Sequence, residues 1–92
     1  MRVSFDITIR GENFRVALVA DASAGQVVGR LRQQITSDSG QRQAIFVFRR
    51  GLGRSDSSIS MHIKLLDATG ETEEVWHAVV TLSGEVIHLH PR

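Results

Sequence analysis

The chain opens with two segments in which apolar and polar side chains alternate. In the first segment the apolar positions are Val3, Phe5, Ile7 and Ile9. In the second segment they are Phe14, Val16, Leu18 and Ala20. A period of two is typical of a strand that buries one face, and the residues Gly11-Glu12-Asn13 between the segments are turn formers. Residues 2–20 are therefore predicted to form a β-hairpin.

The next segment carries a helical pattern. Ser23 and Gln26 match a capping box, in which the two side chains bond each other's backbone N–H groups. Apolar side chains then recur at helical spacing, at Val27, Val28, Leu31 and Ile35. We therefore expect one amphipathic helix over residues 24–37, packed on one face of the sheet.

A continuous apolar run follows the expected helix. Ala44-Ile45-Phe46-Val47-Phe48 has the length of a strand and lacks alternation. This predicts a strand over residues 44–50 that is either central in its sheet or covered on both faces. Residues 51–58 are rich in Gly, Ser and charge, and they predict a loop. No internal repeat or second domain is visible, so residues 1–92 are expected to form a single domain.

The last third predicts a three-stranded antiparallel meander over residues 58–90. Thr69-Gly70 is a candidate two-residue turn, and it would place Ile63 opposite Trp76. Ser83-Gly84 is a second candidate, and it would place Val80 opposite Ile87. Both turns put the apolar side chains of the three strands on one common face, which a slip of one residue would not do.

The same register gathers all four histidines on the opposite face of the meander. His62 would face His77, His77 would face His90, and His88 lies two residues from His90. Three imidazoles that converge could bind a zinc ion, so one hypothesis is a metal site on these four residues. The alternative is a binding or self-association face, which protonation near pH 6 would weaken by crowding positive charges together. On that alternative the partner-binding residues are Val75, His77, Val79, Val86, His88 and His90.

The formal net charge of +1 conceals two oppositely charged parts. Residues 1–55 hold nine Arg and four acidic residues, a balance of +5, whereas residues 56–92 hold two basic and six acidic residues, a balance of −4. A nucleic-acid site is a third hypothesis, carried by Arg42, Arg49, Arg50 and Arg54. A domain with so small a net charge is a poor general binder of nucleic acid, so this partner is not the favoured one.

Other classes of function find little support in the sequence. The chain has no cysteine, which removes disulfides, thiolate metal ligands and cysteine nucleophiles. No apolar run reaches the length of a membrane span and no leader segment is visible, so we expect a cytoplasmic protein that does not bind membranes. No residues form a recognisable catalytic motif, so the chain is expected not to be an enzyme, and zinc is the one cofactor considered.

Three short segments resemble the ubiquitin-like β-grasp family. They are Val16-Ala17-Leu18 with Asp21 and Ser23 after it, Ala44-Ile45-Phe46, and Ile87-His88-Leu89. The resemblance implies a protein-interaction module whose exposed binding patch includes Ile45, His88 and His90. The chain ends in His90-Pro91-Arg92, without the Gly-Gly tail of that family, so conjugation or sulfur-carrier chemistry is not expected.

The expected fold is therefore α+β, a ββα unit followed by four strands, with one helix on a mostly antiparallel sheet in a variant of the β-grasp. The expected function is non-catalytic binding of a protein partner, or self-association, through the histidine face or an edge strand. The expected core consists of Val3, Phe5, Ile7, Phe14, Val16, Leu18, Val28, Leu31, Ile35, Phe46, Ile63, Trp76, Val80, Ile87 and Leu89.

Overall fold

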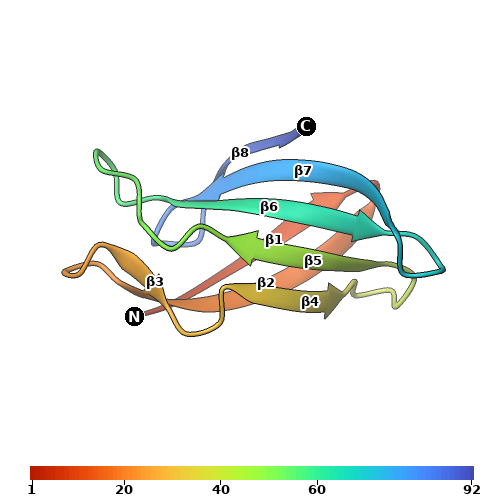
Figure 1. Ribbon diagram of the computed structural model, residues 1–92, viewed down its shortest axis with the longest axis horizontal. Coiled ribbons are helices and arrows are strands. Elements are labelled where there is room, and N and C mark those ends of the chain that lie inside the picture. Colours follow the sequence, from red (N-terminus) through yellow and green to blue (C-terminus); the bar gives the residue numbers. More distant parts are fainter.

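A computed structural model describes all 92 residues, and it contains only strands. The strands are β1 (Arg2–Ile9), β2 (Glu12–Asp21), β3 (Gln26–Val28), β4 (Arg32–Thr36), β5 (Gln43–Phe48), β6 (Ile59–Leu66), β7 (Thr72–Val80) and β8 (Val86–Pro91). They form a three-stranded sheet, β1-β2-β3, and a five-stranded sheet, β4-β5-β6-β7-β8, and every pair is antiparallel. The two sheets pack face to face as a β-sandwich (Figure 1).

The predicted N-terminal hairpin is confirmed, and its turn is tighter than expected. Strands β1 and β2 pair along their whole length, with Ile9 opposite Glu12. The connection is therefore the two residues Arg10 and Gly11, which both have positive φ, 53° and 78°. Positive φ at both central positions matches the right-handed twist of the flanking strands.

The expected helix over residues 24–37 is wrong, and with it the α+β class and the β-grasp. These residues form the β2–β3 turn, β3, a crossing segment and β4, which belongs to the other sheet. Asp21 holds the turn at the start, because its Oδ1 accepts hydrogen bonds from the Ser23 hydroxyl and the Ala24 N–H, at 2.7 and 3.1 Å. Gly29 has φ of 87°, which no residue within an α-helix adopts.

The spacing of the apolar residues in this segment satisfies two periods at once. Leu31 and Ile35 are four residues apart, so they share a face both on a helix and on a strand. Leu31, just before β4, and Ile35 within it are partly buried against the core, whereas Arg32 and Thr36 are exposed. Gln33 lies between them on the inner side and donates from Nε2 to the carbonyl of Ala17, at 3.1 Å. A polar residue on the inward-facing side concealed the alternation.

The C-terminal meander is confirmed, including most of its register. The two-residue turns are wrong, because residues 67–71 connect β6 to β7 and residues 81–85 connect β7 to β8. Ile63 lies opposite Trp76, and Ala78 lies opposite Leu89, as predicted. The pairing of Val80 with Ile87 is wrong, because a bulge after Val79 shifts the register by one residue and pairs Val80 with Val86. A bulge of one residue exchanges the side chains that face in and out.

One hydrophobic core lies between the sheets. Phe46 of β5 is at its centre, with ring centroids 5.9 Å from Phe14 and 6.4 Å from Phe5, both on the opposite sheet. Nine of the expected core residues are buried, and these are Val3, Phe5, Ile7, Phe14, Val16, Leu18, Phe46, Ile63 and Val80. The partly buried ones are Val28, Leu31, Ile35, Trp76 and Leu89. Ile87 is 41% exposed and is no core residue.

Two of the four edge strands of the sandwich, β8 and β1, are obstructed. The N–H of Arg92 donates to the carbonyl of Val75, so the backbone groups of Arg92 point towards β7. The backbone groups of the alternate residues Leu89 and Pro91 therefore point to the free edge of β8, where Pro91 has no N–H to donate. The backbone amino and carbonyl groups of Met1 both form hydrogen bonds with Ala20, so they point towards β2. By the same alternation, the backbone groups of Ser4 point to the free edge of β1. The turn at Gly84 covers the carbonyl of Ser4. These edges are poor templates for an added strand.

Candidate functional site

The candidate site is the face of the five-stranded sheet that points away from the core, called the outer face below. The strand registers arrange its side chains in three rows that run across the strands. Backbone hydrogen bonds from Arg49 to Ser60 and from Arg92 to Val75 extend two of the rows by one residue each. The outer face consists of Arg32, Gln34, Ile45, Val47, Arg49, Ser60, His62, Lys64, Val75, His77, Val79, His88, His90 and Arg92.

The middle row carries three adjacent histidines, as the sequence predicts. His62 lies opposite His77, and His77 lies opposite His90. The ring centroids are 5.9 Å apart in the first pair and 5.1 Å apart in the second. The guanidinium of Arg92 reaches this row, with Nη1 3.3 Å from Nε2 of His62. The row is therefore a packed strip of rings with a permanent cation on it.

His77 is the half-buried centre of this strip. Its Nδ1 is buried and has no hydrogen-bond partner. Burial lowers the pKa of His77 below the ordinary value, and the neighbouring His90, His62 and Arg92 lower the pKa further by repulsion. The ring is consequently held in its neutral form at pH values where a free histidine is already charged.

The four histidines do not converge on one point. No group of three or more His, Asp or Glu side chains has a geometry that could hold a metal ion. His62 and His90 flank His77 on both sides, so they are two strand spacings apart, roughly 9–10 Å. Ligands of one zinc ion must each lie within about 2.1 Å of the metal. His88 belongs to the next row, opposite Val79.

The other residues expected in a partner-binding face are divided between the two sides of the sheet. Val75 and Val79 lie on the outer face and are half-buried. Ile45 is on the outer face as well, but neighbouring side chains cover it and leave 8% exposed. Val86 lies on the inner side and packs against the core, because the bulge after Val79 reverses its direction. Val86 is thus removed from the candidate site.

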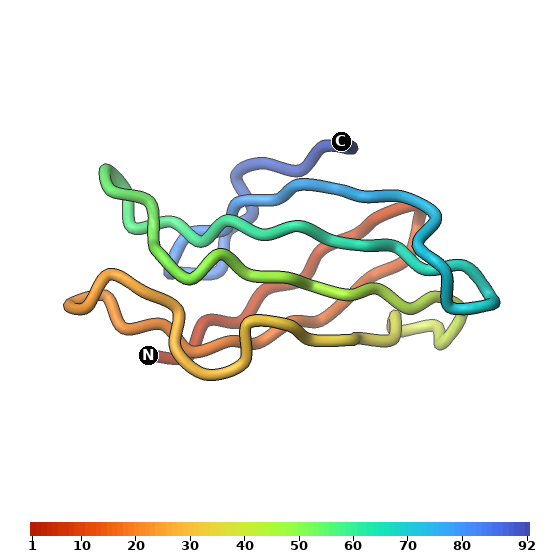
Figure 2. The backbone as a smooth tube through the Cα atoms, viewed as in Figure 1, coloured from red at the N-terminus to blue at the C-terminus, as the bar shows by residue number.

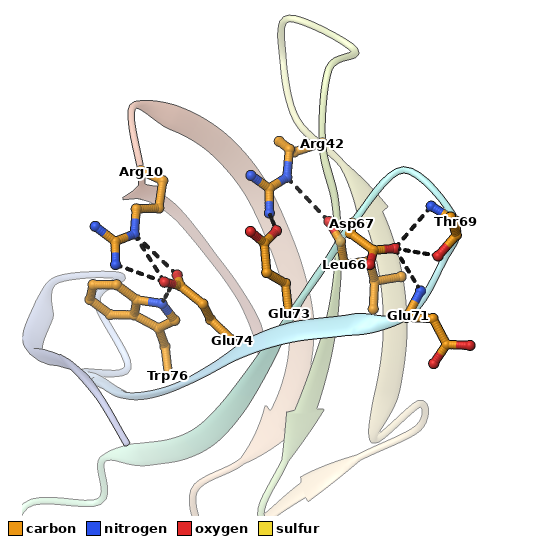
Figure 3. A network of polar contacts seen from close by, with 9 residues as sticks. All are labelled: Arg10, Arg42, Leu66, Asp67, Thr69, Glu71, Glu73, Glu74 and Trp76. Carbon is orange, nitrogen blue, oxygen red and sulfur yellow. Dashed lines mark hydrogen bonds and ion pairs between the residues drawn. The ribbon is translucent and has the colours of Figure 1, made fainter.

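The outer face is positively charged, and its cations have no acidic partners. The three ion pairs of the chain are Arg10–Glu74, Arg15–Asp38 and Arg42–Glu73. Two of them, with the hydrogen bond from Trp76 Nε1 to Glu74, lie at the start of β7, where Glu73 and Glu74 precede Val75 (Figure 3). Arg32, Arg49, Lys64 and Arg92 form none, and the three rows contain no Asp or Glu.

The four arginines of the nucleic-acid hypothesis do not form one group. Arg42 precedes β5 and donates to Glu73 at 2.6 Å and to the carbonyl of Leu66 at 3.2 Å. Arg49, Arg50 and Arg54 follow β5 at its opposite end. Six residues of strand separate the two places, roughly 20 Å. Arg42 is therefore a structural residue that joins strand ends.

Sequence reasoning missed Arg32, Arg92 and the pair of Arg49 with Ser60 as members of this face. Arg32 was assigned to a helix that does not exist. Arg92 could have been found, because the confirmed register of β7 and β8 places it opposite Val75 when it is continued by one pair. The pairing of Arg49 with Ser60 depends on how β5 joins β6 across a loop, which no turn motif specifies.

Comparison of the chain with protein-family models, curated proteins and solved structures finds no match. No helix in the structure is long and apolar enough to cross a membrane. The site must therefore be interpreted from its own chemistry.

Proposed function

We propose that this chain is a non-catalytic protein-interaction module that binds an acidic segment of a partner protein on the outer face. The observation that carries the proposal is the charge of the three rows of that face, where four cations without an ion pair and four histidines occur and no row contains an acidic side chain. Half-buried valines among them, Val47, Val75 and Val79, supply apolar area for a docked chain. Electrostatic complementarity of this kind favours partner selection and fast association.

A second copy of the same chain suits this surface less well. Two outer faces placed against each other would bring like charges together, which is unfavourable. Pairing of copies along β8 is hindered by Pro91, and pairing along β1 is hindered by the β7–β8 turn at Gly84. A partner of opposite charge is therefore preferred over self-association, and the cytoplasmic location expected from the sequence belongs to the same proposal.

Site-specific crosslinking would test the proposal. A photoreactive residue at Gln34, an exposed and uncharged position on the outer face, should give adducts with a partner protein in extracts of the native host, and the adducts should decrease at high salt. A photoreactive residue at Thr8, exposed on the three-stranded sheet, is the matched control and should give none. Equal labelling from both positions, adducts with nucleic acid, or adducts with a second copy would contradict the proposal.

Charge reversal supplies an independent test. Replacing Arg32 and Lys64 with Glu should abolish the adducts, whereas replacing Arg2, exposed on the other sheet, should leave them unchanged. Lowering the pH through the range in which histidine titrates should strengthen binding of an acidic partner and weaken any contact between two outer faces. The sign of the pH effect thus separates the two kinds of partner.

A further inference from the structure

A separate feature lies where β5 ends and β6 begins. Two hollows meet there, and Arg49 and Ser60 line both of them. The first holds about 350 Å³ and extends over the outer face to His62 and His77. The second holds about 400 Å³ and extends under the β5–β6 loop to Arg54. Figure 2 shows this loop projecting past the end of the sheet, beside the β2–β3 turn, to which a bridge between Gln26 and Gly51 ties it.

Three polar side chains that line these hollows are hydrogen-bond donors without a partner in the chain. The guanidinium groups of Arg49 and Arg54 make no hydrogen bond or ion pair within the chain, and neither does the Ser60 hydroxyl. No acidic residue lines either hollow. The acid of the loop, Asp56, lines neither hollow but lies beside Gly53, and its Oδ1 accepts the N–H of Ser58 at 3.0 Å.

The donors are also held close together by the backbone. Arg49 and Ser60 are directly opposite residues of neighbouring strands, joined by a backbone hydrogen bond of 2.9 Å from the N–H of Arg49. Their side chains therefore leave the sheet about 5 Å apart on the same face. His62 is two residues along β6 and points the same way. Arg54 approaches from the loop, so that donors surround the hollow from two sides.

We infer that this place is a binding site for a phosphate monoester, with Arg49, Arg54 and Ser60 as its ligands. Two guanidiniums and a hydroxyl match the charge and the three terminal oxygens of such a group better than those of a carboxylate, which has one charge and two oxygens. The hollows are larger than a phosphate, and the apolar side chains of Val47, Phe48 and Met61 line the part that would receive its carrier. The inference does not rest on the proposed function.

The phosphate could be carried by a phosphorylated side chain of a protein or by a small phosphate ester, and binding assays distinguish these sources. Inorganic phosphate, a phosphoserine peptide and a nucleoside monophosphate would each be titrated by calorimetry and by amide NMR shifts. We expect saturable binding of phosphate, with shifts centred on Arg49, Ser60 and Arg54. The carrier that binds more tightly than inorganic phosphate identifies the source, and acetate at equal ionic strength should not compete.

Variants make the test specific. Arg49→Gln and Arg54→Gln should each weaken binding about tenfold, and Ser60→Ala about threefold, since each removes a charge-assisted hydrogen bond. Arg50→Gln is the matched control, because Arg50 is exposed in the same loop but lines neither hollow. Equal weakening by Arg50→Gln would show general attraction to positive charge and would overturn the inference, as would failure of all three phosphates to bind. Unchanged unfolding midpoints would establish that the variants are folded.

Discussion

Gly84, in the β7–β8 turn, lies against the backbone carbonyl of Ser4 on the opposite sheet. A Cβ atom at Gly84 would come 2.2 Å from that oxygen, and the residue has φ of 90°. The contact closes the sandwich where the meander reaches β1. It also explains why a glycine is required at this turn for two separate reasons, the backbone conformation and the close approach of the sheets.

Replacing Gly84 with Ala should therefore cost more than the same change elsewhere. Gly70, in the β6–β7 turn, has φ of 87° and open space around it, so Gly70→Ala should lose about 1–2 kcal/mol from backbone strain alone. Gly84→Ala has the same strain and a collision with backbone, and should lose about 3 kcal/mol or more. Urea unfolding of both variants measures the difference, and equal losses would disprove the contact.

The ion pair of Arg10 with Glu74 predicts a dependence of stability on acid pH. The Arg10 guanidinium donates to both carboxylate oxygens, with Nη2 2.7 Å from Oε2, and Trp76 Nε1 donates to Oε1 at 3.0 Å (Figure 3). Arg10, followed by Trp76, lowers the pKa of Glu74 from 4.5 to about 2. Because the folded state holds the charged form, this stabilisation is complete above pH 4.5 and is lost as the pH falls towards 2.

Glu74→Gln should accordingly be less stable than the wild type at pH 7 and equal to it near pH 2. Glu85→Gln is the control, since Glu85 is exposed and forms no ion pair. Thermal unfolding of the three proteins at both pH values decides the matter. A stability gap for Glu74→Gln that persists unchanged at pH 2 would contradict a role for the charge of Glu74.

The meander and its histidine row could be predicted because local turn chemistry and side-chain alternation agree there. Thr69-Gly70 and Ser83-Gly84 were recognised independently, and each placed the apolar residues on the same face. The register that follows is the one observed for His62, His77 and His90. The candidate site was found from the sequence to the extent that it depends on this register.

The helix and the places of Val86 and Ile87 were predicted wrongly, because they depend on contacts between distant parts of the chain. Leu31 and Ile35 fit a helix and a strand equally well, and in the structure β4 is held by its pairing with β5 and by the hydrogen bond of Gln33 to Ala17 on the other sheet. The bulge after Val79 exchanges the expected places of Val86 and Ile87, and no residue type marks where it occurs. Long-range packing decides both outcomes, and one sequence does not display it.

Trp76 lies at the border of the core, and replacing it should destabilise the protein less than replacing Phe46 at the centre. Its ring is half-buried against the core, with the guanidinium of Arg10 5.9 Å from the ring centroid. Trp76→Ala should cost about 2–3 kcal/mol, below the 3–5 kcal/mol expected for the fully buried Phe46→Ala. Chemical denaturation measures both values, and a larger loss for Trp76→Ala would mean that Trp76, not Phe46, is the centre of packing.

The half-buried His77 makes the outer face sensitive to mild acid. Because its pKa is lowered in the folded state, by burial first and by His90, His62 and Arg92 after it, the unfolded chain takes up a proton at His77 that the folded chain resists. The stability contributed by this site is therefore present above about pH 6.5 and decreases as the pH falls below it.

His77→Gln, which cannot titrate, should reduce the loss of stability between pH 7.5 and pH 5.5, measured by urea unfolding at each pH. NMR titration of the His77 ring should show its midpoint below that of a free histidine, and the combined His62→Gln and His90→Gln variant should raise that midpoint part of the way, since burial remains. Identical pH dependence in His77→Gln and in the wild type would assign the acid sensitivity to other groups. A partial rise in the double variant would separate the contribution of burial from that of the neighbouring charges.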